Sequence, residues 1–200
     1  MPRQTVTQIG PWQLLDSECR YDNPWIRISH ENVITPAGSQ GIYGRIHFKN
    51  KAITIIPLDK EGNTWLVGQH RYVLDAYSWE LPMGGGPLTM DAIDAAKKEL
   101  QEEVGLAADH WQLIQHLHTS NSVSDEQGLV YLATGLTQIG SQPEETELLT
   151  VKKLPLDEAI GWALNGKITD AISVAALLKV AMLRQRGILN LEQNGKQQPF

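Results

Sequence analysis

The chain has 200 residues, 42% of them hydrophobic, and a formal net charge of −6 at pH 7, which suits one main domain with a sizeable core. No run of lysine and arginine approaches a nucleic-acid-binding patch, so we expect no nucleic-acid partner. Cys19 is the single cysteine, which excludes an intrachain disulfide and a cysteine-based zinc site. No apolar stretch is long enough to span a bilayer, so we expect a cytoplasmic protein without a membrane partner.

The first half of the chain is predicted to form short strands, because β-branched and aromatic runs alternate with Gly, Pro, Asn and Asp. The predicted strands are residues 12–21, 26–35, 41–48, 52–57, 65–69 and 77–81. The glycine cluster Gly84-Gly85-Gly86 follows and is predicted to be a loop. The period then becomes helical from about Asp91 to Val104, and Gly105 is placed to end that helix.

The second half is predicted to return to strands and then to finish with two helices. The expected strands are residues 111–119, 128–134 and 148–153, and the expected helices are residues 156–165 and 170–186. Thr169 or Asp170 can cap the last helix. These elements predict a mixed α/β (α+β) fold with helices packed on a curved, mixed sheet. We divide the chain into an antiparallel strand region at residues 1–50, a main domain at 51–189 and a polar tail at 190–200.

The helix predicted at residues 91–104 has an acidic edge and an apolar stripe. At 100° per residue, Glu99, Glu102 and Glu103 span about 100° of arc. Three carboxylates converging on one point suit a hard divalent cation such as Mg²⁺, which takes oxygen ligands. An acidic face exposed to solvent is the alternative interpretation. The apolar stripe consists of Ile93, Leu100 and Val104.

Two further features of this helix bear on its acidic edge. Asp94 stands four residues before Lys98 and is predicted to pair with it. We therefore expect no basic side chain of the helix to relieve the repulsion among the three glutamates. Ala95 and Ala96 lie beside the glutamates, and their small side chains are expected to let another backbone segment approach closely.

The acidic helix carries a long motif. Gly84, followed by Lys98-Glu99-Leu100-Gln101-Glu102-Glu103-Val104-Gly105-Leu106, resembles the Nudix box. The resemblance implies a Nudix-type α/β/α sandwich and implies that Glu99, Glu102 and Glu103 hold Mg²⁺, with Mn²⁺ as a substitute. It departs from the family where Met90 replaces the first box glutamate and Lys98 replaces the box arginine.

Residues 68–72 and 79–84 are similar to the ADP-ribose and nucleotide-sugar pyrophosphatase branch of that family. In this branch an arginine contacts the substrate, and the residue before the box glycine offers its backbone carbonyl to a metal. The resemblance assigns these roles to Arg71 and Met83. An ordinary surface ion pair is the alternative for Arg71. The other substrate contacts predicted on this resemblance are Arg45, Gly84 and Gly85.

Residues 143–147 look like the acidic loop from which this branch draws its general base and an extra metal ligand. The resemblance makes Glu145 the predicted base and Glu147 the predicted ligand, and it places Glu102 and Glu103 with Glu145 in the catalytic machinery. A carboxylate is a chemically suitable acceptor for the proton of an activated water. A charged turn is the alternative interpretation of this segment.

The resemblance implies Mg²⁺-dependent hydrolysis of the pyrophosphate bond in an ADP-ribose or NDP-sugar type of substrate, which releases NMP and a phosphorylated remainder. A nucleotide-binding module without turnover is the alternative, motivated by Met90 and Lys98. Residues 119–126 lack the proline common in ADP-ribose enzymes, which makes ADP-ribose itself less secure than the broader class. In the resembling branch the first strands build a homodimer and part of the substrate pocket, so we expect a homodimer.

Overall fold

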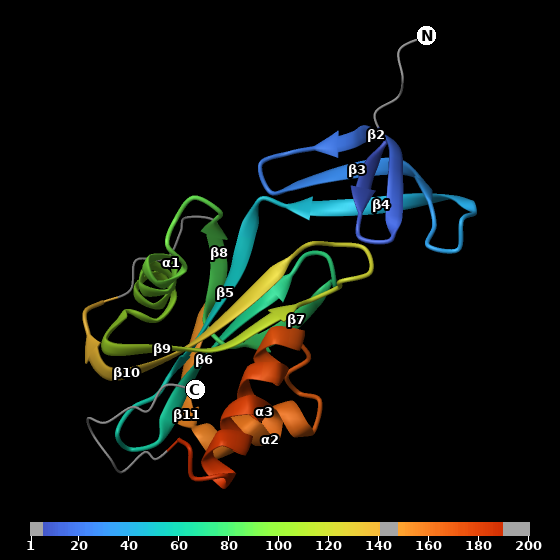
Figure 1. Ribbon diagram of the computed structural model, residues 1–200. Helices are drawn as coiled ribbons and strands as arrows, with labels where there is room; N and C mark the ends of the chain where they lie inside the picture. Colours follow the sequence, from blue (N-terminus) through green and yellow to red (C-terminus); the bar gives the residue numbers. More distant parts are fainter. Residues whose placement is uncertain (1–5, 141–147, 190–200) are drawn as a thin grey trace. The chain divides into compact units, whose positions relative to one another are not determined.

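The computed structural model describes residues 6–140 and 148–189, which divide into two compact units. The N-terminal unit comprises residues up to Lys51 together with His118–Gln127, and the main unit comprises Ala52–Leu117 and the residues from Gly128 onward. Figure 1 shows the elements of both units in chain order. Among the described residues, no helix has the length and apolar character needed to cross a bilayer.

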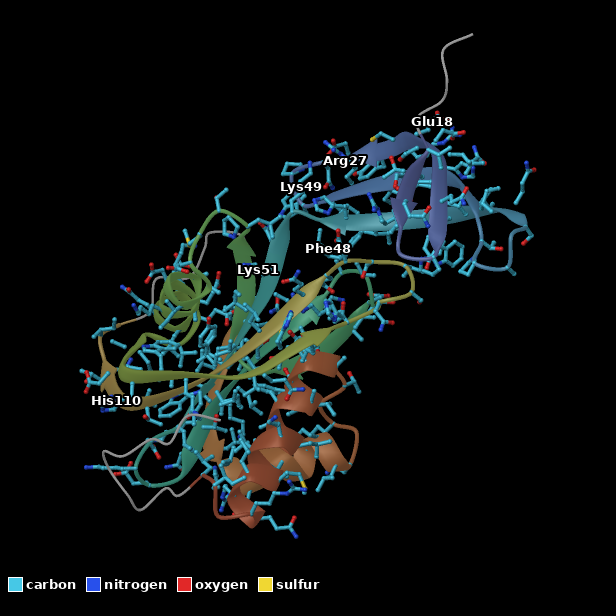
Figure 2. All side chains as sticks on the ribbon, in the orientation of Figure 1. Glu18, Arg27, Phe48, Lys49, Lys51 and His110 are labelled. Carbon is cyan, nitrogen blue, oxygen red and sulfur yellow. The ribbon has the colours of Figure 1, made fainter. Side chains whose placement is uncertain are left out.

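The N-terminal unit is a four-stranded antiparallel sheet in the order β1-β2-β3-β4. Its strands are β1 (Thr7–Ile9), β2 (Trp12–Asp22), β3 (Ile26–Ile34) and β4 (Gln40–Phe48). The three longer strands confirm the predicted ones, whereas β1 was not predicted. Beyond the last residue of β4, Lys49 joins Arg27 in binding the carboxylate of Asp22; Figure 2 labels Arg27 and Lys49 on this unit.

A loop from later in the chain belongs to the same unit. The backbone N–H of Ile46 donates to the carbonyl of Val123 at 2.8 Å, and the N–H of Asp125 donates to the carbonyl of Ile46 at 3.2 Å. The Asp125 carboxylate also accepts from the N–H of Phe48 at 2.9 Å and pairs with His47 at 2.5 Å. Asp125 therefore binds β4 through both its backbone and its carboxylate.

The main unit contains two sheets, one four-stranded in the order β8-β5-β10-β9 and one three-stranded in the order β11-β6-β7. The strands are β5 (Asn50–Pro57), β6 (Asn63–Arg71), β7 (Ala76–Glu80), β8 (Met83–Pro87), β9 (Leu106–His118), β10 (Gln127–Gln138) and β11 (Thr150–Pro155). Strands β5 and β10 run parallel, whereas β6 pairs antiparallel with β7 and β11. The sheet content is thus mixed, as predicted.

The helices are α1 (Ala92–Glu99), which continues as the π-helical turn η1 (Leu100–Val104), α2 (Leu156–Leu164) and α3 (Ala171–Gln185). Gly105 ends η1 at φ 73°, a left-handed conformation that glycine adopts without strain. The Asp170 carboxylate accepts from the N–H of Ser173 at 2.7 Å, so Asp170 caps α3. The predicted end of the first helix at Gly105 and the predicted start of the last helix at Asp170 are both confirmed.

Helices cover both faces of the central strands because successive residues of β5 point in opposite directions. Ile53 and Ile55 join the apolar cluster that contains α1 and η1, whereas Ile56 joins the cluster that contains α2 and α3. The predicted apolar stripe of the first helix is confirmed, since Leu100 and Val104 are buried and Ile93 packs against the same cluster. The result is an α/β/α arrangement, with α1 and η1 on one side and α2 and α3 on the other.

The prediction of a loop at the glycine cluster is wrong, because Met83–Pro87 forms the edge strand β8 next to β5. Glycine has low strand propensity, but tertiary pairing overrides it here, and glycine in a strand permits close approach of a neighbour. A Cβ placed on Gly86 would lie 2.9 Å from Cγ1 of Ile53 and 3.0 Å from Cβ of Ala95. The expected close approach of a backbone segment to the alanines of α1 is therefore confirmed.

Candidate functional site

The predicted site lies where β8 begins against the end of α1 and the turn η1. Glu103 is 5% exposed, and its carboxylate accepts a hydrogen bond from the backbone N–H of Met83 at 2.9 Å. A bond to a buried carboxylate is among the stronger protein hydrogen bonds. Glu103 therefore fixes the start of β8, the segment whose Met83 carbonyl is a predicted metal ligand.

Glu99 lies against the next residue of the same strand. A Cβ on Gly84 would fall 2.1 Å from Cδ of Glu99 and 2.2 Å from its nearer carboxylate oxygen. Because Gly84 has no side chain, the Glu99 carboxylate can lie directly against the backbone of β8. The structure thus brings together Met83, Gly84, Glu99 and Glu103.

Glu102 points elsewhere. Its carboxylate pairs with Nζ of Lys98 at 2.8 Å, and Asp94 pairs with Lys97 at 3.1 Å. The prediction that Asp94 pairs with Lys98 is wrong, and so is the expectation that no basic side chain of the helix relieves the glutamates. In both pairs the lysine and the carboxylate are three or four residues apart, the spacing at which side chains are neighbours on a helix surface.

The turn η1 changes the angular positions on which the predicted acidic edge was based. A π-helix bonds i to i+5 and therefore advances fewer degrees per residue than an α-helix. Placement at 100° per residue holds through Glu99, where α1 ends, and fails for Glu102 and Glu103. Single π-turns inserted in α-helices occur frequently at functional sites.

Among residues 6–140 and 148–189, no three His, Cys, Asp or Glu side chains gather closely enough to hold a metal ion. Glu103 and Glu99 lie along Met83-Gly84, whereas Glu102 is turned to Lys98. Glu145 and Glu147, the predicted base and extra ligand, lie outside the described residues. The metal-ligand assignment therefore stays a prediction.

Arg71, the predicted substrate contact, ends β6 and is held by a buried carboxylate. Its Nε donates to Oε1 of Glu80 at 2.9 Å, and its Nη2 bonds to Oε2. The Glu80 side chain is 4% exposed and that of Arg71 is 38% exposed. The bonds to Glu80 raise the pKa of Arg71 against the opposing effect of burial, with smaller contributions from the charges of Asp170 and Glu103. Arg71 is thus oriented within electrostatic reach of Glu103.

Sequence reasoning missed two residues that support this region, Glu80 and Ser173. Glu80 orients Arg71 through both carboxylate oxygens. Ser173 is fully buried, and its Oγ accepts from the backbone N–H of Leu81 at 2.9 Å, which ties the end of β7 to the start of α3. The acidic side chain of Glu80 within a largely apolar predicted strand could have indicated that it has a buried partner. Nothing in the sequence indicated that Ser173 would bind Leu81.

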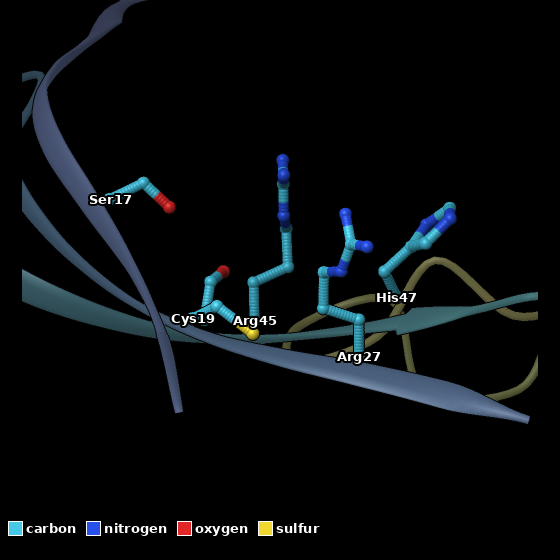
Figure 3. Close-up of a pocket in the computed structure, with 6 residues that line it drawn as sticks. Ser17, Cys19, Arg27, Arg45 and His47 are labelled. Carbon is cyan, nitrogen blue, oxygen red and sulfur yellow. The ribbon is translucent and has the colours of Figure 1, made fainter. Parts of the chain in front are cut away.

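The remaining predicted residues are scattered. Gly85 is exposed on β8, and Met90, which replaces the usual first box glutamate, is 40% exposed in the turn before α1. Arg45 lies on β4 of the N-terminal unit (Figure 3), where its Nε is 3.4 Å from a carboxylate oxygen of Glu31.

Comparison with known families accounts for both units. Residues 49–177 match the family model described as NUDIX domain, and residues 12–46 match the model described as nucleoside diphosphate sugar hydrolase N-terminal domain. The chain belongs to the Nudix family. It is a Nudix hydrolase whose box glutamates sit on α1 and η1.

Relatives of this Nudix hydrolase include the ADP-ribose pyrophosphatase of Mycobacterium tuberculosis (strain ATCC 25618 / H37Rv), which is 35% identical over 180 residues, 84% of this chain and 83% of that protein. The CMP-5'-(N-acetyl-N-hydroxy-3-aminopropyl)phosphonate hydrolase of Streptomyces rubellomurinus (strain ATCC 31215) is 28% identical over 172 residues, 83% of this chain and 82% of that protein. A crystal structure of an ADP compounds hydrolase superposes with a TM-score of 0.79 and 20% identity, covering 90% of this chain and 98% of that one. This likeness confirms the predicted fold class.

Nudix hydrolases use divalent metal ions, and the donor atoms of this chain fit one. The predicted ligands Glu99, Glu102 and Glu103 would offer carboxylate oxygens and Met83 a backbone carbonyl, and these are the oxygen donors that hard divalent cations prefer. The space beside Gly84, which a Cβ would fill, already contains the Glu99 carboxylate. The chemistry of these donors suits such an ion, whereas in the described residues only Glu99 and Glu103 lie along Met83-Gly84 and Glu102 is paired with Lys98.

Proposed function

We propose that this Nudix hydrolase cleaves the pyrophosphate bond of a nucleoside diphosphate linked to another group, of the ADP-ribose or NDP-sugar type, and releases NMP and a phosphorylated remainder. The proposal is supported by the 35% identity to a protein named ADP-ribose pyrophosphatase and by the match of residues 12–46 to a nucleoside diphosphate sugar hydrolase domain. The observation that carries it is the gathering of Glu99 and Glu103 along Met83-Gly84.

We assign Mg²⁺, or Mn²⁺ as a substitute, to Glu99, Glu102, Glu103, the Met83 carbonyl and Glu147. A divalent cation held there supplies positive charge against the pyrophosphate oxygens and acidifies water. In this proposal Glu102 exchanges its pairing with Lys98 for the cation.

Arg71 and Glu145 complete the proposed machinery with the substrate contacts Gly84, Gly85 and Arg45. The guanidinium of Arg71 is oriented by Glu80, and its N–H groups beyond the two given to Glu80 make no hydrogen bond to any residue that the structure describes; such groups suit phosphate oxygens. Glu145 accepts the proton of the attacking water, as a carboxylate base.

The Glu103→Gln variant tests the proposal. The glutamine oxygen can still accept from the Met83 N–H, so the protein is expected to stay folded while the rate falls by orders of magnitude. Release of phosphatase-sensitive product from ADP-ribose and a panel of NDP-sugars with Mg²⁺ measures the rate. The matched control is Asp94→Asn, which removes an exposed carboxylate from the same helix and is expected to leave the rate unchanged. Near-normal activity of Glu103→Gln would refute its role as a ligand.

The same panel separates the enzyme from a binding module. Wild-type protein is expected to turn over at least one substrate with Mg²⁺ or Mn²⁺ and to lose that activity in excess chelator. If the protein binds nucleotide but hydrolyses no substrate of the panel, the alternative of a nucleotide-binding module without catalytic activity is favoured.

We further propose that the strands of the N-terminal unit form a homodimer. The proposal follows the resemblance of these strands to those that build the homodimer in the branch. Exposed apolar side chains on this unit, Trp25 at 64%, Ile42 at 69% and Tyr21 at 53%, are available for such a contact. Sedimentation equilibrium is expected to give twice the monomer mass, and a monomer at all concentrations would contradict this proposal.

A further inference from the structure

The short segment that joins β7 to β8 is held by hydrogen bonds from three distant elements of the main unit. The carbonyl of Pro82 accepts from the N–H of Ile55 on β5 at 2.8 Å. The N–H of Met83 donates to the carboxylate of Glu103 on η1 at 2.9 Å. Leu81, the first residue of the segment, is bound by α3. Proline has no N–H, so the segment is fixed through the main-chain polar groups that it has left.

The contact with α3 depends on a single hydroxyl. Ser173, the third residue of α3, is fully buried, and its Oγ accepts from the N–H of Leu81 at 2.9 Å. The neighbouring buried residues of the helix, Ile172, Ala176 and Leu177, belong to an apolar cluster. A buried hydroxyl and a buried backbone N–H are both costly unless they are bonded. The bond between Ser173 and Leu81 therefore satisfies two buried polar groups at once.

Asp170 fixes Ser173 in turn. The Asp170 carboxylate accepts from the backbone N–H of Ser173 at 2.7 Å, which holds the first turn of α3 in place. The same turn acts on the predicted substrate contact Arg71. The hydrogen bonds to Glu80 raise the pKa of Arg71 most, burial opposes them, and the charge of Asp170 raises it further. The start of α3 thus bears on two parts of the proposed site.

The segment is bound from both layers of helices. Ser173 belongs to the layer of α2 and α3, and Glu103 belongs to the layer of α1 and η1 on the other side of the central strands (Figure 1). Their hydrogen bonds reach Leu81 and Met83, which are two residues apart. A shift at Leu81 is therefore passed to Met83 through the intervening proline, whose φ is fixed by its ring.

We propose that Ser173 is a positioning residue of the catalytic site: its hydroxyl acts through the N–H of Leu81 to fix the backbone carbonyl of Met83. The inference deepens the proposed function and rests on it for the role of that carbonyl as a metal ligand. A purely structural serine would affect only the stability of the fold when its hydroxyl is removed. A positioning serine also affects the affinity of the site for a divalent cation.

Mn²⁺ binding to the full-length protein, followed by electron paramagnetic resonance, measures the site without substrate or turnover. Ser173→Ala keeps nearly the same volume but leaves the buried N–H of Leu81 without its acceptor, so the segment is expected to move. We expect Mn²⁺ to bind several-fold more weakly and kcat/KM to fall several-fold or more, because small displacements at a reacting site are costly. Ser173→Cys has a similar shape and a weak acceptor, and it is expected to fall between the two.

Two buried residues provide matched controls. Val180→Ala opens a cavity on the buried face of the same helix, and it is expected to lower the urea midpoint without changing the Mn²⁺ affinity. Thr64→Val removes a buried hydroxyl of β6 that has no hydrogen-bond partner among the described residues. This change is expected to leave the Mn²⁺ affinity and kcat/KM unchanged.

The outcomes distinguish this inference from the proposed function. Wild-type Mn²⁺ affinity in Ser173→Ala, or an equal loss of affinity in Val180→Ala, would overturn the positioning role. Either result alongside wild-type hydrolysis of the substrate panel leaves the proposed function standing. Weaker Mn²⁺ binding in Ser173→Ala, with no hydrolysis by the wild type, supports the positioning role and removes the proposed function. If Ser173→Ala does not fold, Ser173→Cys decides by the same comparison, and a wild type that binds no Mn²⁺ overturns the inference outright.

Discussion

Replacing Gly84 by alanine tests the contact between β8 and Glu99 without removing any polar group. The added Cβ would lie 2.1 Å from Cδ of Glu99 and 2.2 and 2.3 Å from its two carboxylate oxygens. Non-bonded carbon atoms settle at about 3.5 Å or more, so the carboxylate has to move by roughly 1.4 Å. The move falls on the flexible end of a half-buried side chain, and Gly84 is not among the glycines with positive φ. Alanine is therefore tolerated by the backbone.

The expected result is a large loss of activity with little loss of stability. A displacement of about 1 Å at a catalytic group costs roughly 100-fold in rate, which corresponds to about 2.7 kcal/mol of transition-state stabilisation. We expect kcat/KM for the best substrate of the ADP-ribose and NDP-sugar panel to fall by this order, while the urea midpoint stays close to that of the wild type.

A glycine elsewhere in the main unit provides the control. Gly161 lies within α2, and a Cβ there would meet no atom within 4 Å, so Gly161→Ala is expected to stabilise the protein by about 0.5–1 kcal/mol without affecting kcat/KM. A folded Gly84→Ala protein with wild-type kcat/KM would refute the reasoning, because it would show that the position of Glu99 does not matter to the reaction.

Three further predictions concern stability. Gly86→Ala would press a Cβ to 2.9 Å from Ile53 and 3.0 Å from Ala95, so urea unfolding should show a loss of about 1–3 kcal/mol; an unchanged midpoint would contradict the close packing of β8. Arg71→Ala leaves the carboxylate of Glu80 buried without its cation and should cost about 3 kcal/mol, most of which Arg71→Lys is expected to recover in the same assay. Burial raises the pKa of Asp59, but the bonds from Lys153 and Asn63 outweigh it and leave the pKa below the ordinary 3.8. A lowered pKa stabilises the fold above the unfolded-state value, so the stability gap between wild type and Asp59→Asn should close as the pH falls below 3.8; a gap that widens in acid would contradict this.

Local signals in the sequence were sufficient for much of the fold. Period-2 runs between turn residues located most of the strands, and the apolar stripe with Gly105 as its stop located the helix that carries the glutamates. The N-cap of the last helix was predicted as Thr169 or Asp170, and the structure selects Asp170. These features depend on residues within a few positions of one another, which is why they can be recognised without a fold.

The candidate site was predicted less completely, because its geometry depends on contacts between distant segments. Glu103 accepts from Met83, which is twenty residues away, and the hydrogen bond between Ser173 and Leu81 spans 92 positions. Neither follows from spacing. Lys98 was also predicted to pair with Asp94, whereas it pairs with Glu102. The turn η1 shifts the angular positions of the residues after Glu99.

The sequence by itself determined the family, the helix with the glutamates and most of the strands and helices, because motif and periodicity are properties of neighbouring residues. Only the tertiary structure decided that the glycine cluster is an edge strand, and that Glu99 lies against Gly84. Each of these depends on which surfaces meet when distant segments pack together. That outcome is set by burial and hydrogen bonding summed over the whole chain.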